Sequence, residues 1–276
     1  MIVVTGATGN VGRPLVRALA EAGEQVTALS RGLSAPPDVP AGVRHRRADL
    51  ADPESLKPAF DGADALFLLY SGDMPAAGAD AGAILDAARA GGVRRVVFLS
   101  SQGVGTGRHS PEFEDGVKGS GLEWTVLRPG GFDSNAFQWA EAVRTRRTVT
   151  APFGDVALPT IDPDDIAAVA EAALRKPGHG GSTYVLTGPE PVSPRQQAAA
   201  IGDALGEEVR FAEQSRTEAR TQMLRFMPEP VVEATLGILG DPSPEEQRVS
   251  PDVARVLGRA PGTFAEWATR NAAAFR

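Results

Sequence analysis

The stretch that decides the fold reads Thr5-Gly6-Ala7-Thr8-Gly9-Asn10-Val11-Gly12 and follows the apolar start of the chain. Its glycines have the spacing G-x-x-G-x-x-G between a predicted strand, Ile2–Thr5, and a predicted helix, Gly12–Ala22. Gly6 permits a tight exit from the strand, Gly9 lets backbone N–H groups approach a phosphate, and Gly12 lets the helix pack closely. In this context the triplet predicts a dinucleotide pyrophosphate at the N-terminus of the helix. The alternative is a glycine-rich turn without a ligand. The expected contacts are Gly6, Thr8, Gly9, Asn10, Val11 and Gly12.

Short apolar runs alternate with Ala-rich helical stretches over the first half of the chain. The runs are nearly continuous, which is typical of strands that are covered on both faces of a parallel sheet. The alternation predicts an α/β fold with a Rossmann-type doubly wound sheet. Further strands are expected at Gln25–Leu29, Val43–Ala48, Ala65–Leu69, Arg95–Ser100 and Trp124–Leu127, with helices at Pro53–Phe60, Ala76–Ala90 and Pro111–Lys118.

The pattern changes after Pro129. We expect a nucleotide-binding domain over residues 1–132, to which 159–187 return with a helix and a strand. Residues 133–158 and 188–276 would form a smaller, mostly helical part that covers the substrate, because ligands bind at the carboxyl ends of the strands in such sheets. Within it we expect irregular chain over 130–159, and regular elements at Pro194–Leu205, Glu208–Ala212 (a strand), Thr217–Phe226, Pro228–Leu239 and Phe264–Phe275.

Composition excludes several classes of function. The 276 residues include 28 Lys and Arg against 35 Asp and Glu, a net charge of −7, which argues against a broad basic face for nucleic acid. There is no cysteine, so disulfides, thiolate metal sites and cysteine nucleophiles are excluded. No His/Asp/Glu cluster has metal-ligand spacing, and no apolar run approaches the ~20 residues that span a bilayer. We expect a cytoplasmic protein, monomeric or homodimeric, without a membrane segment or a metal.

The end of the second strand discriminates between the two nicotinamide cofactors. NAD sites place an acidic residue there for the ribose 2′-hydroxyl, whereas this chain has Ser30-Arg31. Arg31 can clamp a 2′-phosphate through charge-assisted hydrogen bonds, and Ser30 can add another, so we predict a preference for NADP(H) over NAD(H). The alternative is that Arg31 is an ordinary exposed arginine. We interpret the nearby Arg44, Arg46 and Arg47 mainly as a solvated face.

Other strand ends supply further candidate contacts to the cofactor. Asp49 can accept a hydrogen bond from the adenine amino group, or can instead be a carboxylate of a helix N-cap region. Leu50 follows it, Leu69 ends the fourth strand, Tyr70 lies just past that strand, and Ser100 follows the fifth. The alternative for Tyr70 is an aromatic rim residue, and for Ser100 it is simple turn chemistry.

These motifs resemble the NmrA-like group of the atypical short-chain dehydrogenase/reductases. The resemblance is carried by Thr5–Gly12, Ser30-Arg31, Asp49-Leu50, Ser100-Ser101 and Gly121–Phe132, with weaker likeness at Asp162–Ala173 and Tyr184–Pro189. It implies a Rossmann core, a nicotinamide cofactor and a small C-terminal part that forms the substrate cleft. Members of the group include quinone reductases, other reductases of small carbonyl or aromatic compounds, enzymes that tailor natural products, and non-catalytic redox sensors.

The catalytic pattern of the wider superfamily is incomplete here. That superfamily uses Tyr-x-x-x-Lys on the helix after the fifth strand, where the tyrosine exchanges a proton with the substrate and the lysine lowers its pKa. The matching stretch has Glu114 in the tyrosine position and Lys118 in the lysine position. Lys118 can bind the ribose or be a solvent-exposed helix lysine. Other candidates for catalysis are Tyr70, Ser101 and His109, and His109 can act as a general acid or be merely solvated.

The segment after the sixth strand supplies candidates for the rest of the site. Backbone groups of Pro129 and Gly130 can hold the nicotinamide carboxamide. The expected lining of an apolar substrate pocket comprises Gly131, Phe132, Asn135, Phe137 and Trp139, and the alternative for the aromatic members is the core beneath the cap.

Together these features predict an oxidoreductase that transfers hydride from NADPH to a quinone or a related planar aromatic or carbonyl compound. A quinone accepts hydride without a strong acid because its ring stabilises the product oxyanion, which suits a chain without the usual tyrosine. The alternative is a non-catalytic NADP(H)-binding redox sensor with a regulatory protein partner. A third possibility, an epimerase or dehydratase with tightly held NAD, is disfavoured by Arg31 and the missing tyrosine.

Overall fold

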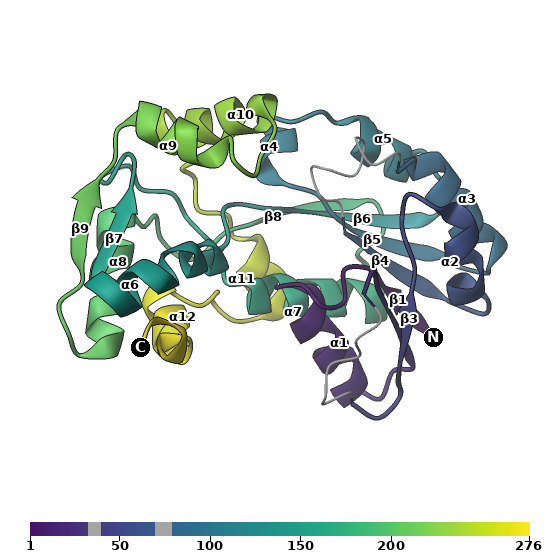
Figure 1. Ribbon diagram of the computed structural model, residues 1–276. Helices are drawn as coiled ribbons and strands as arrows, with labels where there is room; N and C mark the ends of the chain where they lie inside the picture. The colour runs from purple at the N-terminus through teal and green to yellow at the C-terminus, as the bar shows by residue number, and fades with distance from the viewer. Residues whose placement is uncertain (33–39, 70–78) are drawn as a thin grey trace. The chain divides into compact units, whose positions relative to one another are not determined.

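The computed structural model describes residues 1–32, 40–69 and 79–276 (Figure 1). The chain divides into two compact units. Unit 1 comprises Met1–Arg128 and Pro163–Val185, and unit 2 comprises Pro129–Asp162 and Leu186–Arg276. Tyr70 lies outside the described residues.

A seven-stranded sheet has the order β3-β2-β1-β4-β5-β6-β8. Strands β1 to β6 pair in parallel, and the order reverses between β1 and β4. This is the doubly wound arrangement predicted from the alternating pattern, and the prediction is confirmed. The strands are β1 (Ile2–Val4), β2 (Val26–Ser30), β3 (Val43–Arg47), β4 (Ala65–Leu69), β5 (Arg95–Leu99), β6 (Glu123–Pro129) and β8 (Ser182–Leu186).

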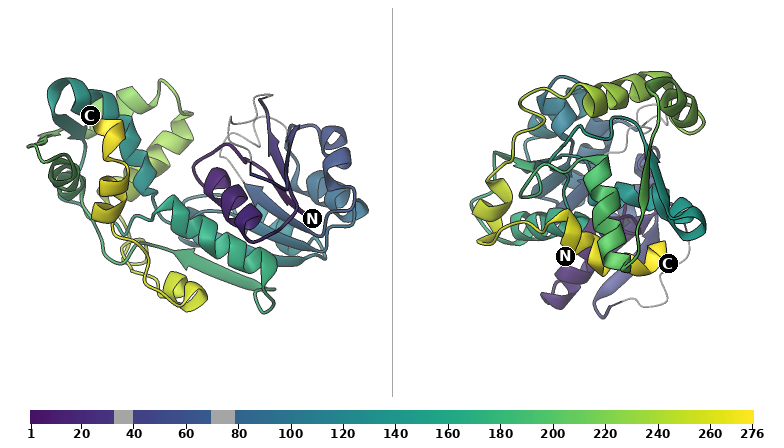
Figure 2. Two further views of the ribbon diagram at one scale, coloured as in Figure 1. Left: turned by 90° about the horizontal axis from the view of Figure 1, so that it is seen from below. Right: turned by 90° about the vertical axis from the view of Figure 1, so that its left-hand side faces the viewer.

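Helices cover both faces of the sheet. Helices α1 (Gly12–Glu21) and α7 (Pro163–Arg175) pack side by side on one face (Figures 1 and 2). The other face carries α2 (Pro53–Phe60), α3 (Ala81–Ala90) and α5 (Glu112–Lys118), and the single turn α4 (Gln102–Gly105) follows β5. Because side chains alternate between the two faces, a strand such as β4 is buried throughout its centre, which explains the continuous apolar runs.

Unit 2 is mostly helical around its own core. Its elements are η1 (Asp133–Trp139), α6 (Ala140–Arg146), β7 (Thr148–Ala151), α8 (Pro194–Leu205), β9 (Arg210–Glu213), α9 (Arg216–Met223), α10 (Glu229–Gly240), α11 (Asp252–Leu257), α12 (Phe264–Arg270) and η2 (Ala272–Phe275). The expectation of irregular chain over 130–159 is wrong, because η1, α6 and β7 lie there. β7 pairs in parallel with β9, which lies about sixty residues later, and no local pattern indicates such a partner.

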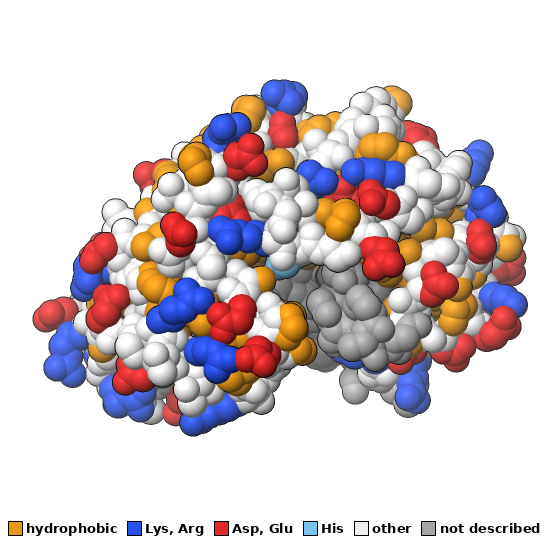
Figure 3. Space-filling view, turned by 90° about the horizontal axis from the view of Figure 1, so that it is seen from above, with side chains coloured by type: hydrophobic (Ala, Val, Ile, Leu, Met, Phe, Trp, Pro, Cys, Tyr) orange, Lys and Arg blue, Asp and Glu red, His pale blue; other side chains and the backbone are white. Residues whose placement is uncertain are grey.

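On the face drawn in Figure 3, basic and acidic side chains are interspersed among the described residues. Within the described ranges, no helix is both long enough and apolar enough to cross a membrane.

Candidate functional site

The turn between β1 and α1 lies where the strand order reverses, and it is tied to both neighbouring strands. The hydroxyl of the buried Thr5 donates to the carbonyl oxygen of Phe67 (3.1 Å) and accepts from the backbone N–H of Leu69 (2.8 Å). The backbone N–H of Ala7 donates to the carbonyl oxygen of Leu29 on β2 (3.1 Å). The sheet therefore holds the turn in place before any ligand binds.

Two of the three glycines are required by the backbone itself. Gly6 has φ +60°, in the left-handed region that favours glycine. A Cβ at Gly12 would lie 2.1 Å from the carbonyl oxygen of Gly6, so any side chain there would push the helix away from the turn. Gly9 donates its N–H to that same oxygen (2.9 Å) and is exposed.

The turn fits the pyrophosphate of a dinucleotide. The N-cap residue of α1, Val11, makes no side-chain hydrogen bond to the helix end, and the first turn carries no acidic residue. The N-terminus of this ten-residue helix therefore keeps its partial positive charge for an anion. Thr8, Gly9 and Asn10 are exposed at the same turn, and Arg13 steadies it by donating to the carbonyl oxygen of Thr8 (3.0 Å).

The end of β2 lies beside a second cation that the sequence did not indicate. Arg31 is exposed, and the hydroxyl of Ser30 donates to the carbonyl oxygen of Gly32 (3.0 Å). In the parallel pairing of β2 with β3, Ser30 stands opposite Arg47, which is also exposed. Only the register of the two strands distinguishes Arg47 from its neighbours, and that register cannot be obtained from the run of arginines alone.

Asp49 shapes the loop that leads into α2. Its carboxylate accepts from the N–H of Ala51 (3.0 Å), and its own N–H donates to the hydroxyl of Ser55 (3.0 Å). The N-cap of α2 is Asp52, which accepts from the N–H of Glu54 (3.2 Å). Leu50 and Leu69 are half-buried.

Glu114 is the centre of a charged cluster at the carboxyl end of β5 and β6. It is 2% exposed and accepts from the hydroxyl of Ser100 (2.9 Å), the ammonium of Lys118 (2.5 Å) and the guanidinium of Arg128 (3.1 and 2.6 Å). The structure thus brings Ser100 and Lys118, two candidate cofactor contacts, to the same carboxylate. Arg128, which the sequence analysis did not single out, supplies half of the hydrogen bonds.

The balance of burial and hydrogen bonding keeps Glu114 ionised. Burial raises the pKa of its carboxyl, but hydrogen bonds from Arg128, Lys118 and Ser100 outweigh that effect and hold the pKa below its usual value. A charged carboxylate does not take the place of tyrosine as a proton donor. Lys118 is half-buried, with its ammonium 5.7 Å from the centroid of the Trp124 ring, and its contact with the ribose stays a prediction.

Ser101 and His109 form a second polar pair close to this cluster in sequence. The hydroxyl oxygen of Ser101 lies 2.8 Å from Nδ1 of His109. Ser101 is half-buried and His109 is exposed. The imidazole lies directly over Gly103, where a Cβ would come 2.6 Å from Nδ1. The pair can pass a proton between the imidazole and the serine hydroxyl, because each group is both a donor and an acceptor.

In unit 2 the segment after β6 is held mainly by backbone bonds. Gly130 donates its N–H to the carbonyl oxygen of Leu186 (2.9 Å), so that N–H is already used. Phe132 is half-buried, and Gly131 and Asn135 are exposed.

The two aromatic side chains of η1 contribute to the core of unit 2. Trp139 is 8% exposed within that core. Phe137 packs against Trp267 (ring centroids 5.0 Å apart) and Phe275 (6.0 Å), although 37% of it stays exposed. Their part in a substrate pocket stays a prediction.

A parallel sheet in this order, with a glycine turn and an uncapped helix N-terminus at the point of reversal, defines a dinucleotide-binding Rossmann protein. The chain matches the NAD(P)H-binding family over residues 6–177 and belongs to that family. The fold is also similar to that of NmrA, a negative transcriptional regulator (TM-score 0.73, 21% identity, 97% and 94% of the two chains covered), as the resemblance to the NmrA-like group implied.

Two relatives match the whole chain. The (4-alkanoyl-5-oxo-2,5-dihydrofuran-3-yl)methyl phosphate reductase of Streptomyces griseus is 37% identical, with 100% of this chain and 99% of the relative covered. The NAD(P)H azoreductase of Xenophilus azovorans is 35% identical with the same coverage. The crystal structure of an NADPH-dependent quinone oxidoreductase from Escherichia coli, in complex with NADPH, is similar in fold, with a TM-score of 0.82, 24% identity, and 98% and 99% of the two chains covered.

Proposed function

We propose that the protein is an NADPH-dependent oxidoreductase that reduces a quinone or a related planar aromatic or carbonyl compound. The observation that carries this proposal is the ionised, buried Glu114 in the tyrosine position. An acceptor that needs a strong acid beside its oxygen is disfavoured there, whereas a quinone forms a product oxyanion that its own ring stabilises. The names of the two full-length relatives support the same class, because a dihydrofuranone and an azo compound are planar conjugated acceptors.

Each group of residues has a separate task in this proposal. The bound nicotinamide supplies the hydride. Gly6, Gly9 and the N-terminus of α1 hold the pyrophosphate, and Lys118 is positioned by Glu114 to bind the ribose.

Between the two nicotinamide cofactors, the protein is proposed to prefer NADPH over NADH. Arg31 and Arg47, on adjacent strand ends, would flank a 2′-phosphate, and neither has a carboxylate partner among the described residues. Ser30 can accept or donate at the same place once its bond to Gly32 is exchanged.

The proton that completes the reduction would come from the Ser101–His109 pair. A proton on Nδ1 of His109 can move to the serine oxygen as the serine proton moves to the reduced acceptor. This path needs no tyrosine, and the exposed imidazole can recover its proton from solvent.

The test is oxidation of NADPH by the purified protein, followed optically with menadione, an enone and cyclohexanone as separate acceptors. The proposal expects rapid oxidation with menadione and little with cyclohexanone. Binding of NADPH is measured separately by titration of its fluorescence. Tight binding without turnover on any acceptor would overturn the proposal and favour the redox sensor.

A further inference from the structure

Residues 101–109, which follow β5 in unit 1 and include α4, fold back on themselves and are here called the α4 loop. The carbonyl oxygen of Gly103 accepts from the backbone N–H of His109 (3.0 Å). The N–H of Val104 donates to the carbonyl oxygen of Ser101 (3.1 Å). Because backbone groups of the loop bond to one another, a displacement at one of its residues is passed on to the Ser101–His109 pair.

The α4 loop lacks a side chain at the two positions where other groups press on its backbone. A Cβ at Gly103 would lie 2.6 Å from Nδ1 of His109. A Cβ at Gly105 would lie 2.7 Å from Nη1 of Arg128 and 3.4 Å from its Cζ. The guanidinium of Arg128 therefore lies directly against the backbone of α4.

Glu114 holds that guanidinium in place. Nε and Nη2 of Arg128 both donate to the carboxylate (3.1 and 2.6 Å), and such a two-point contact fixes the orientation of the guanidinium as well as its position. Glu114 is itself buried and held by Ser100 and Lys118. The guanidinium cannot turn away from a larger residue at position 105 without breaking one of these hydrogen bonds.

The start of the α4 loop is tied to the same charged cluster. The backbone N–H of Ser100 donates to the carbonyl oxygen of Leu127 on β6 (2.8 Å), and its hydroxyl donates to Glu114 (2.9 Å). Ser100 directly precedes Ser101, and Leu127 directly precedes Arg128. The cluster thus supports the loop at two places, just before Ser101 and again at Gly105.

We propose that Arg128 is a positioning residue, which supports the α4 loop at Gly105 and so keeps Ser101 and His109 in contact for proton transfer. Arg128 acts through that pair. The proposal rests on the proposed reductase activity and its proton path and deepens both, because it gives the charged cluster in the tyrosine position a task in the proton step.

The test exchanges the sizes of the two groups in contact. Gly105→Ala adds a methyl group where Nη1 of Arg128 lies, and position 105 is helical, so alanine strains this contact alone. Arg128→Lys keeps the positive charge but lacks the guanidinium that fills this space. Steady-state reduction of menadione at saturating NADPH is measured for the wild type, both single variants and the double variant.

The expected result is a loss in each single variant that the double variant restores. Gly105→Ala should lower kcat about tenfold, because a misplacement of about 1 Å can cost up to about 100-fold. Arg128→Lys should lower kcat about threefold, since a lysine cannot make the two-point contact to Glu114. The double variant should return to within about twofold of the wild type, because the added methyl group occupies the space that Nη1 leaves.

Two further measurements separate positioning from a general loss of structure. The Kd for NADPH, from titration of its fluorescence, should stay within about twofold in every variant, so that the effect lies in kcat. In a Ser101→Ala background, Gly105→Ala should lower kcat by less than about a further twofold, because the pair that it displaces is already broken.

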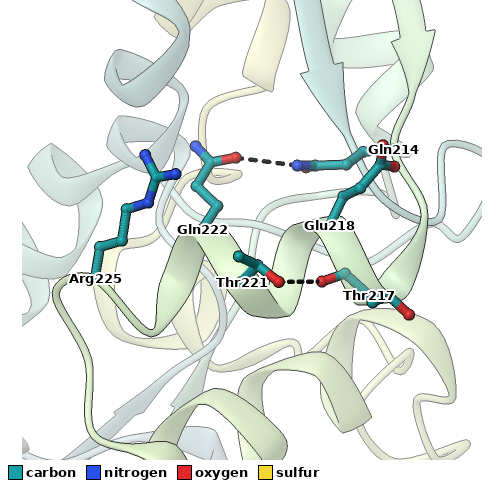
Figure 4. Close-up of a pocket in the computed structure, with 6 residues that line it drawn as sticks. All are labelled: Gln214, Thr217, Glu218, Thr221, Gln222 and Arg225. Atoms are coloured by element: carbon teal, nitrogen blue, oxygen red, sulfur yellow. Dashed lines mark hydrogen bonds between the residues drawn. The ribbon is translucent and has the colours of Figure 1, made fainter.

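The matched control makes the same exchange at an exposed arginine of unit 2. Arg225→Lys alters a residue that lines the surface cavity along α9 (Figure 4) and should leave kcat and the Kd for NADPH unchanged.

Three results would overturn the inference. A normal kcat of Gly105→Ala would show that the contact with Arg128 has no effect on the reaction. Losses of the two single variants that multiply in the double variant would show that the two groups act independently. An undiminished loss in the Ser101→Ala background would show that the contact does not act through the proton-transfer pair.

Failure of the proposed function has a different signature. If the wild type reduces no acceptor, or if Ser101→Ala keeps a normal kcat, positioning is measured at His109 itself. The chain has three histidines, so ¹H–¹³C NMR spectra of the full-length protein contain three imidazole Cε1 signals. The His109 signal, assigned with His109→Gln, should shift in Gly105→Ala and return in the double variant, while the signals of His45 and His179 stay in place. An unmoved His109 signal in Gly105→Ala would overturn the inference whatever the activity.

Discussion

Replacement of Glu114 by glutamine tests the charged cluster that stands in the tyrosine position. The substitution keeps the shape of the side chain but removes its charge. It also turns an amide N–H₂ toward the ammonium of Lys118 or the guanidinium of Arg128, so at least one buried contact becomes donor against donor.

The expected loss of stability follows from the burial of the carboxylate. Removing one partner of a buried ion pair typically costs about 3–5 kcal/mol, because the other charge is left uncompensated. The side chains of Lys118 and Arg128 are 31% and 22% exposed and can recover part of their hydration. We therefore expect Glu114→Gln to lower the free energy of unfolding by about 3 kcal/mol, a large share of the roughly 5–15 kcal/mol typical of a domain.

The assay is urea unfolding followed by tryptophan fluorescence between pH 7 and pH 4. The pKa of Glu114 is lowered in the folded protein, so its contribution is fully present above the ordinary value of 4.5 and is lost as the pH falls through the folded pKa. The difference between wild type and Glu114→Gln should hence be constant near neutrality and shrink in acid. Glu112→Gln, on the exposed side of the same helix, is the control and should change stability by no more than about 0.5 kcal/mol.

Two results would refute this reasoning. A loss below about 1 kcal/mol at pH 7 would mean that solvent screens the cluster as it screens a surface pair. A loss that does not diminish toward pH 4 would mean that the substitution acts through packing and not through charge.

Three further predictions concern the cofactor turn and the proton path. Gly12→Ala places a Cβ 2.1 Å from the carbonyl oxygen of Gly6 and should raise the Kd for NADPH at least about tenfold, so unchanged affinity in a fluorescence titration would contradict the role of this close approach. Arg31→Ala and Arg47→Ala should each raise the Kd for NADPH roughly tenfold and leave that for NADH within about twofold; equal effects on both cofactors would exclude a contact to the 2′-phosphate. Gly103→Ala should displace the His109 imidazole and lower kcat for menadione about tenfold with NADPH binding unchanged, whereas a normal kcat would remove the Ser101–His109 pair from the mechanism.

Features that depend on near neighbours in the chain were predictable from the sequence. The bounds of α2 and α8 match the expected Pro53–Phe60 and Pro194–Leu205, because each helix begins with a proline in its first turn. The doubly wound sheet followed from apolar runs of strand length alternating with helical stretches. The glycine turn was predictable from the spacing of its glycines. The close approach of Gly12 to the carbonyl oxygen of Gly6 involves residues only six positions apart in the chain.

The candidate site itself depends on contacts between distant residues, which only the tertiary structure decides. Glu114 was recognisable as a departure from the tyrosine pattern, but its pairing with Arg128 requires β6 to lie beside the residues that lead from β5 to α5. Arg47 becomes a neighbour of Ser30 only through the register of β2 and β3. Local sequence sets dihedral preferences and burial patterns, whereas the free energy of a charged group depends on which distant groups the fold places around it.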